Sequence, residues 1–162
     1  MSYYRLKRVK RENNFPLNCY EMFLAYVRKN STFAAKITIN DEKIIKGIKY
    51  LLNEENLTAE VIQKKGYEGD IIIPETVVFK KVAYRVTSIG DGALCDCESL
   101  TNITIPDSVT SIGDCALKEC SSLTSIIFQG TMAQWNEIDF GNGWNDEVPI
   151  KVIHCTDGDV EI

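Results

Sequence analysis

The chain has 162 residues and a formal net charge of −5, and 44% of its residues are hydrophobic. This is the composition of one globular domain, and it excludes wholesale disorder and, because no run of 18 apolar residues occurs, a membrane-spanning helix. Residues 42–162 carry twenty acidic against ten basic side chains, which excludes nucleic acid as a partner of this part of the chain.

Residues 1–41 form a basic extension, with eight Lys or Arg against three acidic residues. Its basic start precedes an apolar stretch at 15–27, as in a signal peptide, but Glu21 interrupts that stretch and no A-x-A cleavage site follows. Three interpretations stay open: a degenerate signal or misassigned start, an amphipathic helix beginning at Pro16, or a region without fixed structure. The domain itself is expected at 42–162.

Several strands are predicted before the main repeat. Apolar alternation predicts strands at 48–51 and 58–62, joined by a turn at Asn53–Asn56. The segment Ile71–Glu75, which contains Pro74, resembles the later segment Ile103–Asp107, which contains Pro106. Residues 77–84 read as a β-hairpin that covers the first coil, because a terminal repeat must hide an open edge.

An internal repeat dominates the sequence. Residues 86–108 and 109–131 are identical at thirteen of 23 positions, beginning with the shared Val-Thr-Ser-Ile-Gly-Asp. A coil of this length cannot bury its own apolar face, whereas stacked copies form a continuous core. The sequence therefore predicts a β-rich α/β fold, a short right-handed leucine-rich-repeat solenoid with a 23-residue period.

The repeat also predicts which side chains face outward. Leu100, Ile103 and Ile105 have the spacing of a half-buried strand, so the residues between them should lie on the surface. We expect these short side chains to bind a protein or glycan partner. The predicted binding residues are Thr101, Asn102, Thr104, Thr124, Ser125 and Ile127.

The C-terminal end carries a predicted helix–strand cap. Thr131 and Gln134 have the spacing of a capping box, which predicts a short helix. A last strand is expected at 150–155, and Trp135 and Trp144 are interpreted as a lid on the final coil.

No catalytic, metal or cofactor site is predicted. The cysteines at 95, 97, 115 and 120 lack the C-x₂-C pairs of structural zinc, and Cys97 and Cys120 should stack inward as repeat equivalents. A disulfide between Cys95 and Cys115 stays open as an alternative. His154 and Cys155 are neighbours on a predicted strand, so their side chains should point to opposite faces and cannot form a catalytic pair.

The V-T-S-I-G-D-x-A-L and C-x-x-L-T-x-I motifs, with Ile105–Val109, resemble the BspA-like leucine-rich-repeat family of bacterial surface proteins. The resemblance implies a secreted or surface-attached, non-enzymatic protein that acts in adhesion and protein recognition. We expect a monomer. Two alternatives are a structural spacer or fragment of a larger surface protein, and a cysteine hydrolase that uses Cys155.

Overall fold

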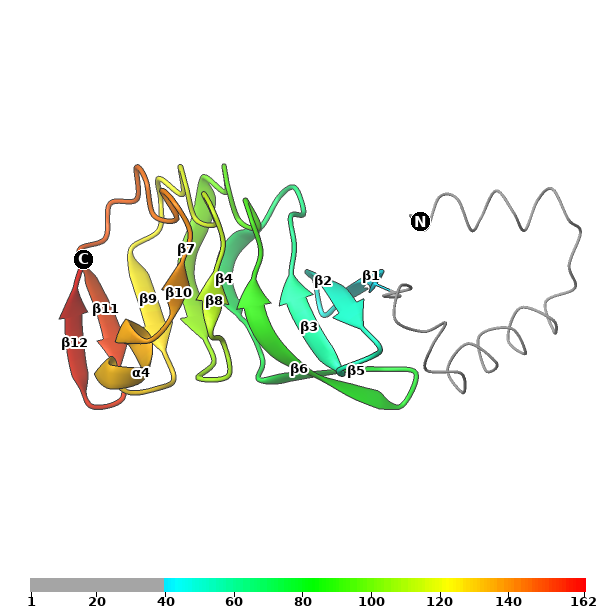
Figure 1. The fold of residues 1–162 in the computed structure, drawn as a ribbon. Coiled ribbons are helices and arrows are strands. Elements are labelled where there is room, and N and C mark those ends of the chain that lie inside the picture. The colour runs from blue at the N-terminus through cyan, green and yellow to red at the C-terminus, as the bar shows by residue number, and fades with distance from the viewer. Residues whose placement is uncertain (1–39) are drawn as a thin grey trace, which may run out of the picture. The chain divides into compact units, whose positions relative to one another are not determined.

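The computed structural model describes residues 40–162, and residues 41–162 form one compact unit. Four turns of chain stack along one axis, and each contributes one strand to each of two sheets (Figure 1). The first sheet contains β3 (Thr58–Val61), β6 (Val82–Ile89), β8 (Ser111–Ile112) and β10 (Asp139–Phe140). The second sheet contains β4 (Glu68–Ile72), β7 (Ser99–Ile105), β9 (Ser125–Phe128) and β11 (Val152–Cys155).

The strands pair in the register that the 23-residue repeat predicts. In the first sheet Ile89 pairs with Ile112, and in the second sheet Ile103 pairs with Ile126, both in parallel. These side chains are buried, as are the repeat equivalents Leu100 and Leu123. The predicted stacked solenoid is confirmed.

The solenoid contains more turns than the repeat alone indicates. Asp139 and Phe140 pair with Ser111 and Ile112, so residues 139–142 are a further copy of the Ser-Ile-Gly-Asp segment. This copy is displaced by 28 residues instead of 23, because helix α4 (Met132–Asn136) lies between the strands. The insertion and the altered residues conceal the copy in the sequence.

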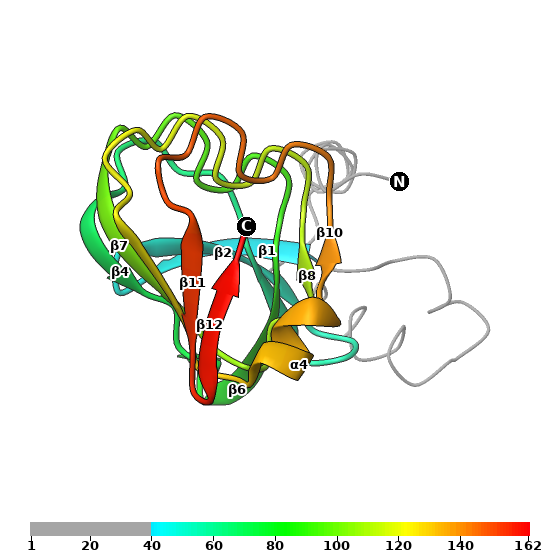
Figure 2. The ribbon, with the colours of Figure 1, turned by 90° about the vertical axis from the view of Figure 1, so that its left-hand side faces the viewer.

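The loops that join β6, β8 and β10 to the second sheet repeat one backbone shape (Figure 2). Each contains two residues with positive φ, a conformation that glycine adopts most easily. The first of these positions has φ between 53° and 59° and the second between 58° and 61°. The equivalent residues are Gly92, Cys115 and Gly143 at the first position, and Asp96, Glu119 and Glu147 at the second.

Strands β1 (Asn40–Ile45) and β2 (Ile48–Asn53) close the N-terminal end. They extend the first sheet beyond β3 and run across that end of the solenoid, where Tyr50 and Leu52 join the core (Figures 1 and 2). The predicted hairpin exists as β5 (Thr76–Phe79) paired with β6, but it is not the outermost element. It projects below the sheet, and Val78 is exposed because no described segment lies over it.

At the C-terminal end Thr131 and Gln134 form the predicted capping box of α4. Trp135 is only 2% exposed, and its ring contacts those of Phe128 and Trp144 at centroid distances of 5.3 and 6.0 Å. Strand β12 (Gly158–Glu161) pairs with β11 and completes the second sheet, and it is not among the strands predicted from the sequence. Within the part of the chain that the structure describes, no helix is long and apolar enough to span a membrane.

Candidate functional site

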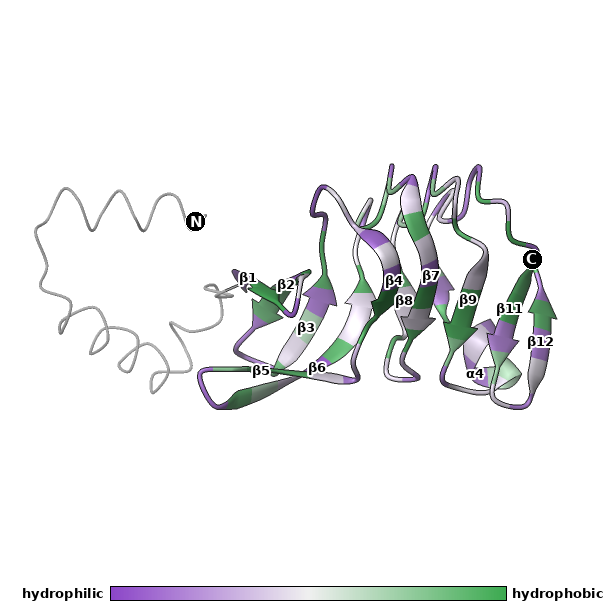
Figure 3. Ribbon diagram, turned by 180° about the vertical axis from the view of Figure 1, so that it is seen from behind, coloured by the Kyte–Doolittle hydropathy of each residue, from purple (hydrophilic) through white to green (hydrophobic). Residues whose placement is uncertain are grey.

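The outer face of the second sheet carries most of the predicted binding residues. Register places Thr104 between Ile72 and Ile127 in one row across β4, β7 and β9, and His154 of β11 continues that row. Asn102 and Ser125 form a second row with Asp70. Figure 3 shows the second sheet from this side, and β4 and β7 each contain both polar and apolar residues.

Two of the predicted residues, Thr101 and Asn102, form hydrogen bonds with Asp70, which the sequence analysis did not predict as a binding residue. The Thr101 hydroxyl donates a hydrogen bond of 2.8 Å to Oδ1 of Asp70, and the Asn102 amide donates to the same oxygen. The bond from Asn102, followed by that from Thr101, lowers the pKa of Asp70. Asp70 is therefore an oriented, ionised acceptor on an exposed strand. It could have been found by extending the Ile71–Pro74 alignment one residue upstream, where Asp70 becomes the equivalent of Asn102.

The remaining predicted residues differ in how available they are. The Thr124 hydroxyl donates a hydrogen bond of 3.1 Å to the carbonyl of Thr101, so it links two turns of the solenoid. Ile127 is 44% exposed, and Ile72, which was not predicted, is 67% exposed. At the far end of their row His154 Nδ1 lies 2.9 Å from Asp159 Oδ1. The face thus combines aliphatic side chains with acidic groups.

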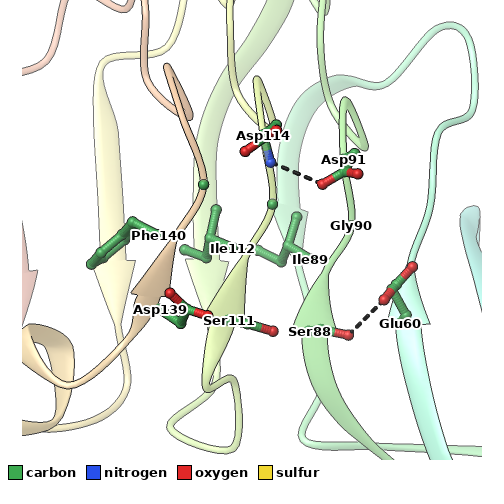
Figure 4. A pocket seen from close by; sticks show the side chains of 12 residues that line it. Glu60, Ser88, Ile89, Gly90, Asp91, Ser111, Ile112, Asp114, Asp139 and Phe140 are labelled. Atoms are coloured by element: carbon green, nitrogen blue, oxygen red, sulfur yellow. Dashed lines mark hydrogen bonds between the residues drawn. The ribbon is translucent and has the colours of Figure 1, made fainter.

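A groove of about 330 Å³ lies on the first sheet, along β3, β6, β8 and β10 (Figure 4). Two of its polar side chains bond to each other, since Ser88 donates to Glu60, and Asp91 accepts the backbone N–H of Asp114 at 2.9 Å. Asp114 in turn accepts the N–H of Asn142 at 2.7 Å. Each aspartate therefore joins its own turn to the next, which is a structural role.

A second hollow, of about 280 Å³, lies beside β4. One wall is β4 itself, and the others are the β1–β2 turn with Lys46 and Gly47 and the loop from Lys64 to Tyr67. The hydroxyl of Tyr67 accepts a hydrogen bond from the backbone of Lys49 and donates one to the carbonyl of Ile62, which holds this loop in place. The hollow adjoins the acidic and apolar residues of the strand face.

Five cysteines lie within the part of the chain that the structure describes. Those at 95, 97, 115, 120 and 155 are free thiols, so the alternative of a Cys95–Cys115 disulfide is not what this structure shows. Burial, then the nearby Asp157 and Asp159, raises the pKa of Cys155, which opposes formation of a nucleophilic thiolate. Its neighbour His154 is directed to Asp159 on the adjacent strand. Among the described residues no group of three or more His, Cys, Asp or Glu is placed to hold a metal ion.

Comparison with known proteins places the repeat in a family. Residues 71–146 match the family model described as a BspA type leucine rich repeat region with six copies. A leucine-rich cell surface protein of Faecalibacterium prausnitzii has 28% sequence identity and a TM-score of 0.53, over 72% of this chain and 32% of that protein. The chain thus spans about a third of that relative's length.

A second solved structure agrees in fold. A leucine-rich repeat protein of Bacteroides capillosus has 18% identity and a TM-score of 0.52, over 70% of this chain and 97% of that one. No curated protein matches the chain. The comparisons establish the type of repeat and its architecture.

Proposed function

The chain is a leucine-rich-repeat protein of the BspA type, and on that premise we propose that it is a non-enzymatic recognition module of a secreted or surface-attached protein. The outer face of the second sheet is its binding surface, and a protein or glycan is its partner. The observation that carries this proposal is the alignment of two exposed isoleucines, Ile72 and Ile127, on either side of the half-buried Thr104 in one row.

The architecture suits binding because the strand face is ordered before any partner arrives. Its central strands β7 and β9 have parallel neighbours on both sides, so association orders few backbone groups. Stacked repeats present such rigid, extended surfaces. A surface of only a few rows gives modest affinity, which several copies on one cell would raise through avidity.

The charges on this face favour a basic partner. Asp70 and Glu68 lie on β4, and Asp159 and Glu161 lie on β12 at the opposite edge of the sheet. No Lys or Arg occurs within the five strands of this sheet. Complementary charge selects partners and accelerates their encounter.

The test is an array of matrix proteins and glycans probed with the full chain. We expect saturable binding that the face variants Thr104→Arg and Ser125→Arg weaken. The matched control is Ser111→Arg, on a half-buried serine of the first sheet. Binding that all three substitutions affect equally would show that the outer face of the second sheet is not the site.

A further inference from the structure

The second sheet has an open edge at β4. Its strand order is β12-β11-β9-β7-β4, and among the described residues β4 hydrogen-bonds to β7 alone. The N–H of Ile73 donates a hydrogen bond of 2.9 Å to the carbonyl of Thr104 on β7. Because backbone groups of consecutive strand residues point to opposite sides, the N–H and C=O of Ile72 face away from β7, toward the open edge.

The open edge adjoins a hollow with defined walls. The hollow of about 280 Å³ is lined by Asp70, Ile71 and Ile72 on one side and by Lys46 and Lys64 on the other. The ammonium of Lys64 lies 4.9 Å from the centre of the Tyr67 ring, and the Tyr67 hydroxyl is itself hydrogen-bonded to β2. Unpaired strand backbone beside a cavity with fixed walls is the arrangement that accepts an added strand.

We propose that β4 binds an extended protein segment of a partner, which joins the second sheet as an additional strand. This inference rests on the proposed function, because it names the class of partner and the way in which it docks. The segment pairs with β4 through main-chain hydrogen bonds to Ile72. Its alternate side chains lie on opposite faces of the sheet and contact the β4 residues of the same face.

The residues of β4 specify the chemistry of that segment. Asp70, oriented by Thr101 and Asn102, faces a basic side chain, and the exposed Ile72 two residues later faces an apolar one. Glu68, at the start of the strand, adds a second negative charge, although Gly69 has φ of 66° and the register shifts between Gly69 and Asp70. The segment therefore has the pattern basic-x-apolar with a further basic residue beyond it, in either direction, because opposite charges across strands stabilise pairing and like charges destabilise it.

Charge also argues against a second copy of this chain as the occupant. The other open strand of the second sheet is β12, and it carries Asp159 and Glu161. Pairing β12 with β4 would place these carboxylates against Asp70 and Glu68. Two β4 strands paired with each other would bring the same like charges together. A basic segment from a different protein avoids both conflicts along β4. Because Lys46 and Lys64 across the hollow repel it, its basic side chains pair with Glu68 and Asp70 and not with that wall.

The experiment measures fluorescence anisotropy of labelled peptides with the full chain. The probe is Thr-Arg-Thr-Arg-Thr-Val-Thr, and the charge control has both arginines replaced by glutamates. Two further peptides carry N-methyl groups on one or the other alternate set of backbone amides. We expect saturable binding of the arginine peptide and about tenfold weaker binding of the glutamate peptide. Of the two methylated peptides only one should bind about tenfold more weakly, because only one set of amides faces β4.

Variants of the chain test the edge directly. Ile72→Pro removes the outward N–H, whereas Ile72→Ala removes only side-chain contact, so the proline variant should bind about tenfold more weakly than the alanine variant. Asp70→Asn should weaken the arginine peptide about threefold, and its matched control Asp139→Asn, on the first sheet, should not. Circular dichroism of each variant verifies that the fold is retained.

The outcomes separate this inference from the proposed function. Equal binding of both methylated peptides, or of the Ile72→Pro and Ile72→Ala variants, overturns the strand-addition proposal. A lack of saturable binding by both the arginine peptide and its reversed sequence, Thr-Val-Thr-Arg-Thr-Arg-Thr, also overturns it. Loss of array partners in Thr104→Arg and Ser125→Arg would still support the face as a site. Conversely, sensitivity to Ile72→Pro with no effect of the two face variants supports the edge and rejects the face.

Discussion

The two sheets of the solenoid come from the same repeat but use their polar groups differently. On the first sheet Asp91 and Asp114 each accept a backbone N–H from the next turn, so the carboxylates connect the repeats. On the second sheet Ile72 and Ile127 are exposed, and Asp70 accepts hydrogen bonds from the side chains of Thr101 and Asn102 on the next strand. Both sheets therefore link their turns through polar side chains, but the second sheet also presents aliphatic side chains to solvent.

This difference determines where the sequence can vary. The loops beyond the first sheet approach each other so closely that glycine is required at Gly113 and Gly141. The outer positions of the second sheet contact only solvent and their row neighbours, so many residue types fit there. A surface whose residues can vary, on a scaffold whose residues cannot, is suited to recognition.

The largest expected effect is that of Gly113→Ala. A Cβ at this position would meet Oδ1 of Asp91 and would lie 2.6 Å from its backbone nitrogen and 2.8 Å from the carbonyl carbon of Gly90. Since backbone of the preceding turn cannot move aside cheaply, we expect a loss of about 3 kcal/mol in the free energy of unfolding. Urea denaturation measures it.

Gly47→Ala is the control for this prediction. Gly47 has a positive φ of 86°, and a Cβ there would meet nothing within 4 Å. It should cost only about 1 kcal/mol, the conformational penalty alone. Similar losses for the two variants would show that close approach of the turns does not constrain the first sheet.

A pH effect of intermediate size is expected from the core between the sheets. Burial raises the pKa of Cys120 from 9.0 to about 12. Because the unfolded chain releases this proton first, the stability that the neutral thiol contributes is complete below pH 9 and is lost as the pH rises to about 12. The difference in melting temperature between the wild type and Cys120→Ala should therefore shrink between pH 8 and pH ~11. A constant difference would contradict the raised pKa.

The fold could be predicted from the sequence because the two copies of the repeat share thirteen positions in one register, which leaves few alternatives for how the coils stack. The further turn at Asp139–Asn142 was missed because neither its spacing nor most of its residues are conserved in the repeat. The face was predicted only in part. Side-chain alternation identifies outward positions such as Thr104. It does not reveal that Thr101 and Asn102 donate hydrogen bonds to Asp70, because Asp70 lies on a strand 31 residues before Thr101.

A smaller and opposite effect is expected at Cys115, in the loops beyond the first sheet. Its φ is 53°, and the equivalent positions in the neighbouring turns are Gly92 and Gly143. Cys115→Gly relieves the left-handed strain of a residue with a Cβ, so it should stabilise the chain by about 0.5–1 kcal/mol in spite of the greater freedom of the unfolded chain. Gly92→Ala should destabilise it, and a loss of stability in Cys115→Gly would show that the thiol contributes packing that outweighs the strain.

The smallest expected effect tests the other half of the comparison. Ile127→Thr replaces an outward side chain of the second sheet by another β-branched residue, so it should change the free energy of unfolding by less than about 0.5 kcal/mol. The same substitution one residue earlier, Ile126→Thr, places a hydroxyl in the core and should cost more than about 2 kcal/mol. Urea denaturation of the pair measures how independent the face is of the scaffold. A large loss in Ile127→Thr would mean that the row of Ile72, Thr104 and Ile127 supports the fold, and the argument that it is free for a partner would fail.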